Sequence, residues 1–185
     1  MGIVNVVATT IPDVQLIEPR VFRDERGEFF ETFQADRYRE VTSVDFVQDN
    51  CSRSKRGVLR GLHYQIENPQ AKLVTVLHGE IFDVAVDIRQ GSPTFGQWVG
   101  MNLSGENRKQ LYLPIGFAHG FCVVSESAEV LYKCSDFYNP QGERTIQWND
   151  PELAIDWPVE VPILSPKDAA ATSFADAPYF ERIAV

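Results

Sequence analysis

The sequence predicts an all-β fold, a sandwich or barrel built from short antiparallel strands. Over most of the chain, apolar and polar residues alternate with a period of two, which is the pattern of half-buried strands. Glycine, proline and asparagine separate these stretches at near-regular intervals, as they do in sandwiches and barrels. Helical patterns are confined to two short segments. The 185 residues contain no linker, repeat or low-complexity stretch, so we expect one domain over residues 1–185.

Two strands are clearest in "KLVTVLHGEIFDVAVDIR", residues 72–89. We expect one strand up to a turn at His78-Gly79 and a second strand after the turn. One face of the second strand carries Phe82, Val84, Val86 and Ile88, and the other carries Asp83, Ala85 and Asp87. Because this other face is mostly polar, we predict that it faces solvent, as in an antiparallel sheet with one wet side.

The remaining elements follow from the same patterns. After the loop "GSPTFGQ", the segment "WVGMNL" (98–103) is a predicted strand. "KQLYLPIGFAHGFCVVS" (109–125) predicts two short strands around a Pro-Gly corner, and "AEVLYKCSDFY" (128–138) predicts one more. The two helical segments are "ADRYREV" (35–41) and "SPKDAAA" (165–171). In the latter, Ser165 is the expected N-cap, Pro166 the first helical residue and Asp168 the third.

Composition and charge exclude several classes of protein. A hydrophobic share of 44% with 23% charged residues is ordinary for a globular chain. The formal net charge of −9 argues against general binding to nucleic acid or to anionic membranes. The N-terminus lacks the basic and apolar regions of a secretory signal. Cys51, Cys122 and Cys134 are widely spaced and form no CxxC pair, so we expect reduced thiols in a cytoplasmic protein.

The corner "PIGFAHGF" gives the barrel a more specific form. Pro114, Gly116 and His119 make a P-x-G-x-x-H pattern that resembles the second motif of the cupin superfamily. The resemblance implies a cupin-type jelly-roll (double-stranded β-helix) barrel with the histidine at its mouth. Many cupins bind a metal, but this chain has only three histidines and no H-x-H pair. We therefore predict that the site holds no metal.

The stretch "RGVLRGLHYQ", residues 56–65, poses a question about side-chain direction. Arg60 and His63 are three residues apart, so a regular strand would send them to opposite faces. Gly57 and Gly61 make a bulge or bend plausible in this strand. Either His63 is a packed core histidine beside a solvated arginine, or Arg60 and His63 converge on one anionic ligand.

A definite chemistry follows if five of these side chains face one barrel. The set is His63, His119, Arg60, Lys72 and Tyr132. It supplies a base near neutral pH, a phenol that can donate a proton, and cations for an anionic substrate. Such a set suits proton abstraction next to a carbonyl, which needs no cofactor because the substrate's ketone accepts the electrons. The sequence contains no G-x-G-x-x-G, P-loop or G-x-S-x-G motif, which removes the main rival chemistries.

Eight motifs then occur in one order, as part of a match that runs from about Val21 to about Asp168. They are "VFRDERGEFFETF", "FVQDN", "GVLRGLHYQ", "GEIFDVAVDIR", "SPTFGQW", "PIGFAHGF", "YKCSDFYNP" and "WNDPELAIDWP". Together they resemble the dTDP-4-dehydrorhamnose 3,5-epimerase family. The resemblance implies a cofactor-independent isomerase of dTDP-L-rhamnose biosynthesis. This enzyme would invert C3 and C5 of dTDP-4-dehydro-6-deoxy-D-glucose to give dTDP-4-dehydro-L-rhamnose.

The resemblance also implies four catalytic residues. His63 matches the family's general base, and Asp168 matches the carboxylate that pairs with it. Tyr132 matches the acid that reprotonates the opposite face, and Lys72 matches the lysine near the C4 oxygen.

Nine more positions match substrate-binding residues of the family. Arg60 and Arg23 match diphosphate contacts, and Tyr138 matches an aromatic that stacks on thymine. The others are Glu28, Gln48, Asn50, His119, Glu143 and Lys167. The family forms homodimers that exchange N-terminal strands. Arg23, Glu28, Gln48 and Asn50 are therefore expected either in this chain's site or in its partner's.

Other interpretations of these residues stay open at this point. Asp168 could serve only as a helix cap, and Tyr132 could be core filler on an apolar strand. Asp83 and Asp87 could orient a histidine or simply line the barrel. At the level of function, the alternatives are a relative that epimerises one carbon of a related ketosugar and a non-enzymatic module that binds nucleotide sugars.

Overall fold

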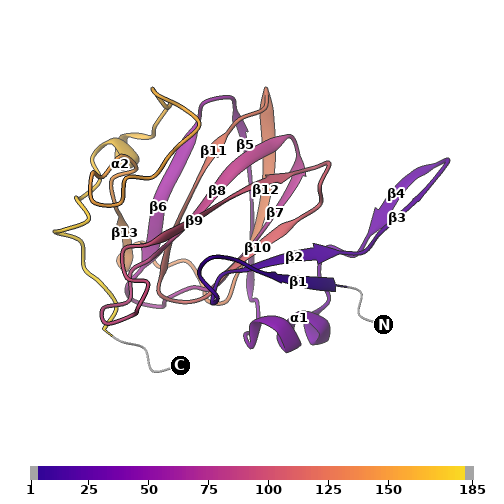
Figure 1. The fold of residues 1–185 in the computed structure, drawn as a ribbon, viewed down its shortest axis with the longest axis horizontal. Coiled ribbons are helices and arrows are strands. Elements are labelled where there is room, and N and C mark those ends of the chain that lie inside the picture. The colour runs from indigo at the N-terminus through magenta and orange to yellow at the C-terminus, as the bar shows by residue number, and fades with distance from the viewer. Residues whose placement is uncertain (1–3, 182–185) are drawn as a thin grey trace.

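Two antiparallel sheets pack face to face in the computed structural model, which describes residues 4–181 (Figure 1). The first sheet has the order β1 (Val4–Ala8), β2 (Gln15–Pro19), β10 (Gln110–Leu113), β7 (Lys72–His78), β12 (Ser127–Cys134) and β5 (Gln48–Lys55). The second has the order β13 (Glu143–Thr145), β6 (Leu59–Gln65), β11 (Phe117–Val123), β8 (Glu80–Asp87) and β9 (Trp98–Ser104). This arrangement confirms the predicted jelly-roll type of all-β fold.

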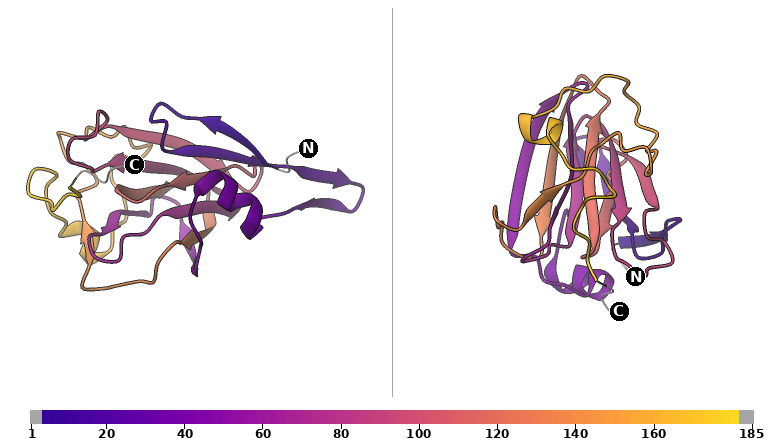
Figure 2. Two further views of the ribbon diagram at one scale, coloured as in Figure 1. Left: turned by 90° about the horizontal axis from the view of Figure 1, so that it is seen from below. Right: turned by 90° about the vertical axis from the view of Figure 1, so that its left-hand side faces the viewer.

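Three smaller elements complete the chain. Strands β3 (Val21–Asp24) and β4 (Gly27–Phe30) form a separate hairpin, α1 spans Ala35–Thr42, and α2 spans Pro166–Ala169. The β3–β4 hairpin projects from the body on the side opposite α2, as two views of the ribbon agree (Figures 1 and 2). Within residues 4–181, no helix has the length and hydropathy needed to cross a membrane.

The predicted strands and helices are present, with the turn at His78-Gly79 between β7 and β8, but the strand predicted over 128–138 ends at Cys134. The turn carries the chain from one sheet to the other, because β7 pairs with β10 and β12 whereas β8 pairs with β11 and β9. Strand β5 was not predicted from the pattern. Its sequence, QDNCSRSK, has no apolar alternation, and it is held as an edge strand by a full-length pairing with β12.

The prediction of a solvent-facing side of β8 is wrong. Asp83, Ala85 and Asp87 have no exposed surface. They lie on the inner face, where Ala85 packs in a cluster that includes residues of the opposite sheet, such as Val74 and Val130. The outer face of β8 is buried too, under the segment after β13, through Leu153, Trp157, Phe174 and Phe180. Both faces are therefore covered, and the polar face is the one that lines the interior.

A β-bulge interrupts the pairing of β6 with β11. His63 lies opposite His119, but Arg60 lies opposite Phe121, so two residues of β6 face the single residue Gly120. The extra residue reverses the alternation of side chains between Arg60 and His63. Gly61, at the bulge, has φ +114°, and a Cβ there would meet the backbone oxygen of His119 at 2.5 Å. The bulge therefore requires glycine at position 61.

We expect Gly61→Ala to lower the free energy of unfolding by about 3 kcal/mol, because the methyl group adds a backbone clash to the cost of a positive φ. Gly57→Ala is the matched control, since Gly57 also has a positive φ but has no atom within 4 Å of a Cβ. The control should lose only about 1 kcal/mol. Urea unfolding of the two variants measures the difference, and equal losses would contradict the close approach at Gly61.

Candidate active site

A cavity of about 410 Å³ opens between the two sheets. Ten of the thirteen residues that the sequence predicts for the site line it. They are Gln48, Asn50, Arg60, His63, Lys72, His119, Tyr132, Tyr138, Glu143 and Lys167. Sequence reasoning did not identify the other four lining residues, which are Tyr64, Gln65, Gln70 and Phe121. Tyr64 and Gln65 lie on β6 and Phe121 lies on β11, and both strands also carry predicted site residues. Their neighbours on these strands are the signal that could have identified them.

His63 and Asp168 form a hydrogen-bonded pair at one wall of the cavity. The Nε2 of His63 lies 2.5 Å from the Oδ1 of Asp168, although the two residues are 105 positions apart. The second carboxylate oxygen of Asp168 accepts from the hydroxyl of Ser165 at 2.7 Å, and the Asp168 backbone N–H donates to the Ser165 Oγ at 3.1 Å. Asp168 therefore bonds to Ser165, the N-cap of α2, with one oxygen and contacts His63 with the other.

The charges of this pair follow from burial and from mutual contact. Burial lowers the pKa of His63 below its ordinary value, and Asp168 only partly offsets this. Burial alone would raise the pKa of Asp168, but the bonds from His63 and Ser165 outweigh it and lower that pKa. At neutral pH the pair is therefore a carboxylate and a neutral imidazole. With Nε2–H donated to Asp168, the lone pair of Nδ1 is available to take a proton.

Arg60 and His63 converge on the same cavity, which answers the question of direction. The bulge at Gly61 turns both side chains to one side of β6. The guanidinium of Arg60 is steadied by Ser54 of β5, whose Oγ accepts from Nε at 3.1 Å and from Nη2 at 3.0 Å. His63 is not a closed core histidine, because 24% of its side chain remains exposed. The remaining guanidinium hydrogens of Arg60 are suited to an anionic group of a ligand.

Tyr132 and Lys72 come from the opposite sheet. Tyr132 lies on β12 and pairs with Val74, two residues after Lys72 on β7, so the three share one face of the sheet. Burial raises the pKa of Tyr132, which keeps the phenol protonated. Burial lowers the pKa of Lys72, and the nearby Cys134, Glu143 and Asp83 act in the other direction. The candidate base thus lies on one sheet, and the candidate acid lies on the facing sheet.

His119 has its own carboxylate partner. Its Nε2 lies 2.8 Å from the Oδ1 of Asp83, and both residues are buried. The sequence left open whether Asp83 and Asp87 orient a histidine or only line the barrel. Asp83 contacts a histidine. Asp87 instead binds the guanidinium of Arg89, which donates to it from Nε at 2.9 Å.

A hydrogen-bonded group lies at the mouth of the cavity. Glu143 accepts from the hydroxyl of Tyr138 at 3.0 Å and from the ammonium of Lys167 at 2.9 Å. The backbone N–H of Tyr138 donates to the Oε1 of Gln48 at 2.9 Å. The ring of Tyr138 stays half-exposed, with 53% of the residue accessible. It therefore offers a flat aromatic face at the entrance.

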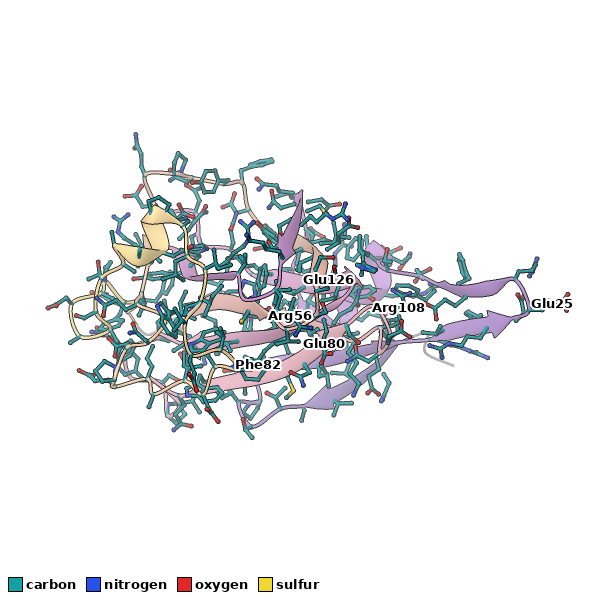
Figure 3. All side chains as sticks on the ribbon, turned by 90° about the horizontal axis from the view of Figure 1, so that it is seen from above. Glu25, Arg56, Glu80, Phe82, Arg108 and Glu126 are labelled. Carbon is teal, nitrogen blue, oxygen red and sulfur yellow. The ribbon has the colours of Figure 1, made fainter. Side chains whose placement is uncertain are left out.

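Three predicted residues do not line this cavity: Asp168, which contacts it through His63, and Arg23 and Glu28, which lie away from it. Arg23 and Glu28 both lie on the β3–β4 hairpin, where the Nε of Arg23 donates to Glu28 at 3.2 Å. Glu28 also binds Arg108, which lies at the base of the hairpin, whereas Glu25 marks its tip (Figure 3). Gln48 and Asn50, in contrast, line this chain's own cavity.

In the described part of the chain, no three His, Cys, Asp or Glu side chains lie together in a way that could hold a metal ion. The absence of a metal stays a prediction, which elemental analysis of the purified protein can test.

We expect Asp168→Asn to lower the pKa of His63 further. The substitution removes the negative charge that raises this pKa and leaves the effect of burial unopposed. Proton–carbon NMR of the imidazole groups can follow the titration, and the exposed His78 is an internal reference. An unchanged or higher pKa of His63 in the variant would contradict the pairing with Asp168.

Comparisons with known proteins agree with this geometry. The family model described as dTDP-4-dehydrorhamnose 3,5-epimerase matches residues 8–176. The dTDP-4-dehydrorhamnose 3,5-epimerase of Pseudomonas aeruginosa is 61% identical over 173 residues, which are 92% of this chain and 96% of that protein.

Solved structures give the same result. The dTDP-6-deoxy-D-glucose-3,5-epimerase of Legionella pneumophila, in complex with dTDP-4-keto-L-rhamnose, is 56% identical with a TM-score of 0.94. The match covers 98% of this chain and 100% of that one. A 3'-monoepimerase of Streptomyces bikiniensis, in complex with dTDP-quinovose, is 35% identical with a TM-score of 0.85, and the match covers 91% and 87% of the two chains. The chain belongs to the dTDP-4-dehydrorhamnose 3,5-epimerase family.

Proposed function

We propose that this cavity epimerises a dTDP-linked 4-keto-6-deoxy sugar at C3 and C5, without a cofactor. The substrate is dTDP-4-dehydro-6-deoxy-D-glucose and the product is dTDP-4-dehydro-L-rhamnose, on the route to dTDP-L-rhamnose. One observation carries the proposal. The His63–Asp168 pair lies on one sheet, while Tyr132 and Lys72 lie on the sheet that faces it. Inversion of a carbon requires a proton to leave from one face and to return to the other.

In the proposed reaction, His63 removes the proton next to the C4 ketone through Nδ1. Asp168 holds the ring by its Nε2–H and stabilises the imidazolium that forms. The negative charge moves to the C4 oxygen, where the ammonium of Lys72 stabilises the enolate. Tyr132, kept protonated by burial, then donates its proton to the opposite face of the carbon. His63 then releases its proton to water and Tyr132 takes one up from water, so that one such round at C3 and one at C5 give the product.

The rest of the cavity binds the nucleotide. Arg60, steadied by Ser54, provides hydrogen-bond donors for the diphosphate, and the half-exposed ring of Tyr138 stacks on thymine. Gln48 and Asn50 contact the nucleotide from β5, and His119 contacts the sugar. Glu143 and Lys167 bind the substrate at the mouth of the cavity. The cations lie together at this site, so the acidic net charge of the chain does not oppose binding of an anion.

A one-carbon epimerase is the second candidate, because a 3'-monoepimerase is among the similar structures. The identities favour double epimerisation: 61% to a 3,5-epimerase against 35% to the monoepimerase.

We expect the protein to exchange deuterium from heavy water into both C3 and C5 of dTDP-4-dehydro-6-deoxy-D-glucose, as followed by proton NMR. His63→Ala should slow this exchange by about 100-fold or more, because the general base is lost. His78→Ala is the matched control, since His78 is exposed and lies outside the cavity.

The outcomes separate the candidates. Exchange at neither carbon in the wild-type protein would refute the enzyme and leave a binding module. Exchange at one carbon only would favour the monoepimerase. Full exchange by His63→Ala would remove His63 from its role.

We also propose a homodimer in which the β3–β4 hairpin of one protomer completes the site of the other. The hairpin carries Arg23 and Glu28 away from this chain's own cavity, on the side opposite α2 (Figures 1 and 2). It also exposes two aromatic rings, Phe22 at 47% and Phe29 at 69%. Such rings on a projecting hairpin are suited to burial against a second chain. In the partner's site, Arg23 would be the second cation for the diphosphate.

A mixture of two inactive variants tests this exchange. We expect Arg23→Glu and His63→Ala to be nearly inactive alone but to recover about a quarter of wild-type activity when equal amounts are mixed after dissociation and refolding. In the mixed dimer, one site combines an intact His63 with an intact hairpin from the partner. No recovery, despite mixed dimers shown by mass spectrometry, would contradict the exchange.

The proposal includes a cytoplasmic location. Cys51, Cys122 and Cys134 are all free thiols, which fits a reducing compartment.

A further inference from the structure

Asp83 differs from the other buried carboxylates of the chain. It has no exposed surface, and only its Oδ1 is bonded, to the Nε2 of His119. Its Oδ2 is buried and has no hydrogen-bond partner among residues 4–181. A buried charge with an unpaired oxygen costs the fold free energy that an apolar side chain would not cost.

Asp87, four residues along the same face of β8, shows what a purely structural carboxylate looks like here. Both of its oxygens are bonded, with donors from the backbone and guanidinium of Arg89 and from the hydroxyls of Ser92 and Thr94. Its charge is thus compensated locally by a cation. Asp83 has no such arrangement, although its surroundings on β8 are equally buried.

The position of His119 connects Asp83 to the reaction. His119 on β11 lies directly opposite His63 on β6, and both histidines line the cavity. With Nε2–H donated to Asp83, the Nδ1 of His119 is the ring nitrogen left for the sugar. Two neighbouring histidine–carboxylate pairs therefore meet at the cavity, one with its carboxylate on α2 and one with its carboxylate on β8.

The negative charge of Asp83 also raises the pKa of Lys72, after the larger effects of Cys134 and Glu143. Charged and titratable groups from several elements surround that ammonium: Cys134 on β12, Glu143 on β13, Asp83 on β8, Lys167 on α2 and His63 on β6. Of the two carboxylates, Glu143 is already shared by Lys167 and Tyr138. The charge of Asp83 is the one that no cation neutralises among the described residues.

We propose that Asp83 is a positioning residue of the epimerisation, which fixes the Nε2–H tautomer of His119 and so leaves the Nδ1 of that ring for the sugar. This inference rests on the proposed function for its kinetic part only. The tautomer of His119 is a property of the protein without substrate.

The test uses Asp83→Asn, which keeps the shape of the side chain and removes its charge. Nitrogen-15 NMR can resolve the ring nitrogens of the three histidines, with assignment by single substitution. We expect the wild-type His119 to carry its proton on Nε2 only, and the variant to show a mixture of tautomers. A wild-type His119 protonated on Nδ1 and not on Nε2 would overturn the proposal, even if the variant does not fold.

The kinetic readout concerns Lys72. Burial lowers the pKa of Lys72 and the charge of Asp83 raises it, so the variant should lose its ammonium at a lower pH. The alkaline limb of kcat should therefore move to lower pH, with kcat reduced about tenfold or more and KM nearly unchanged. The acidic limb, which follows His63, should stay in place.

Asp87→Asn is the matched control, with the same burial on the same strand. It should lower the stability of the protein and leave both the tautomer of His119 and the alkaline limb of kcat unchanged. If Asp83→Asn behaves like this control in both readouts, the proposal is overturned. If the wild-type protein exchanges no deuterium, the proposed function fails, while the tautomer still decides the role of Asp83 towards His119.

Discussion

The bulge between β6 and β11 is the constraint on which the site depends. At Gly61 the backbones of the two strands approach so closely that a Cβ would lie 2.5 Å from the oxygen of His119. The extra residue of β6 at this point turns Arg60 and His63 to the same side and sets His63 opposite His119. A regular strand would send either Arg60 or His63 out of the barrel.

The second constraint is the placement of charge. His63 depends on a carboxylate that a four-residue helix holds in place, since Asp168 also bonds to the N-cap Ser165. Tyr132 and Lys72 project from the facing sheet, so the distance between the sheets separates the base from the acid. In the proposed reaction, the two layers of the jelly roll give the two faces of the sugar ring different chemical neighbours.

The sequence allowed the fold class, the central strands and most of the site to be predicted, and the reasons for the failures are physical. The polar face of β8 was predicted to face solvent because the apolar face was expected to be the one turned to the core. Alternation cannot show that a later segment, such as the one around Trp157, covers the apolar face from outside. Strand β5 is held by its pairing with β12, and its own residues show no alternation of apolar and polar side chains that would predict a strand. The convergence of Arg60 and His63 stayed open because a bulge depends on how closely the partner strand approaches. Arg23 and Glu28 lie on a hairpin that projects from the body, and no pattern of alternation shows where such a hairpin is placed.

A crystal structure of this protein with dTDP-4-dehydro-L-rhamnose bound is the measurement that decides whether the bulge assembles one site. We expect the diphosphate on the guanidinium of Arg60, thymine on the ring of Tyr138, and the sugar between His63 on one sheet and Tyr132 on the other. A diphosphate bound away from Arg60, or a sugar with His63 and Tyr132 on the same face of its ring, would contradict the mechanism.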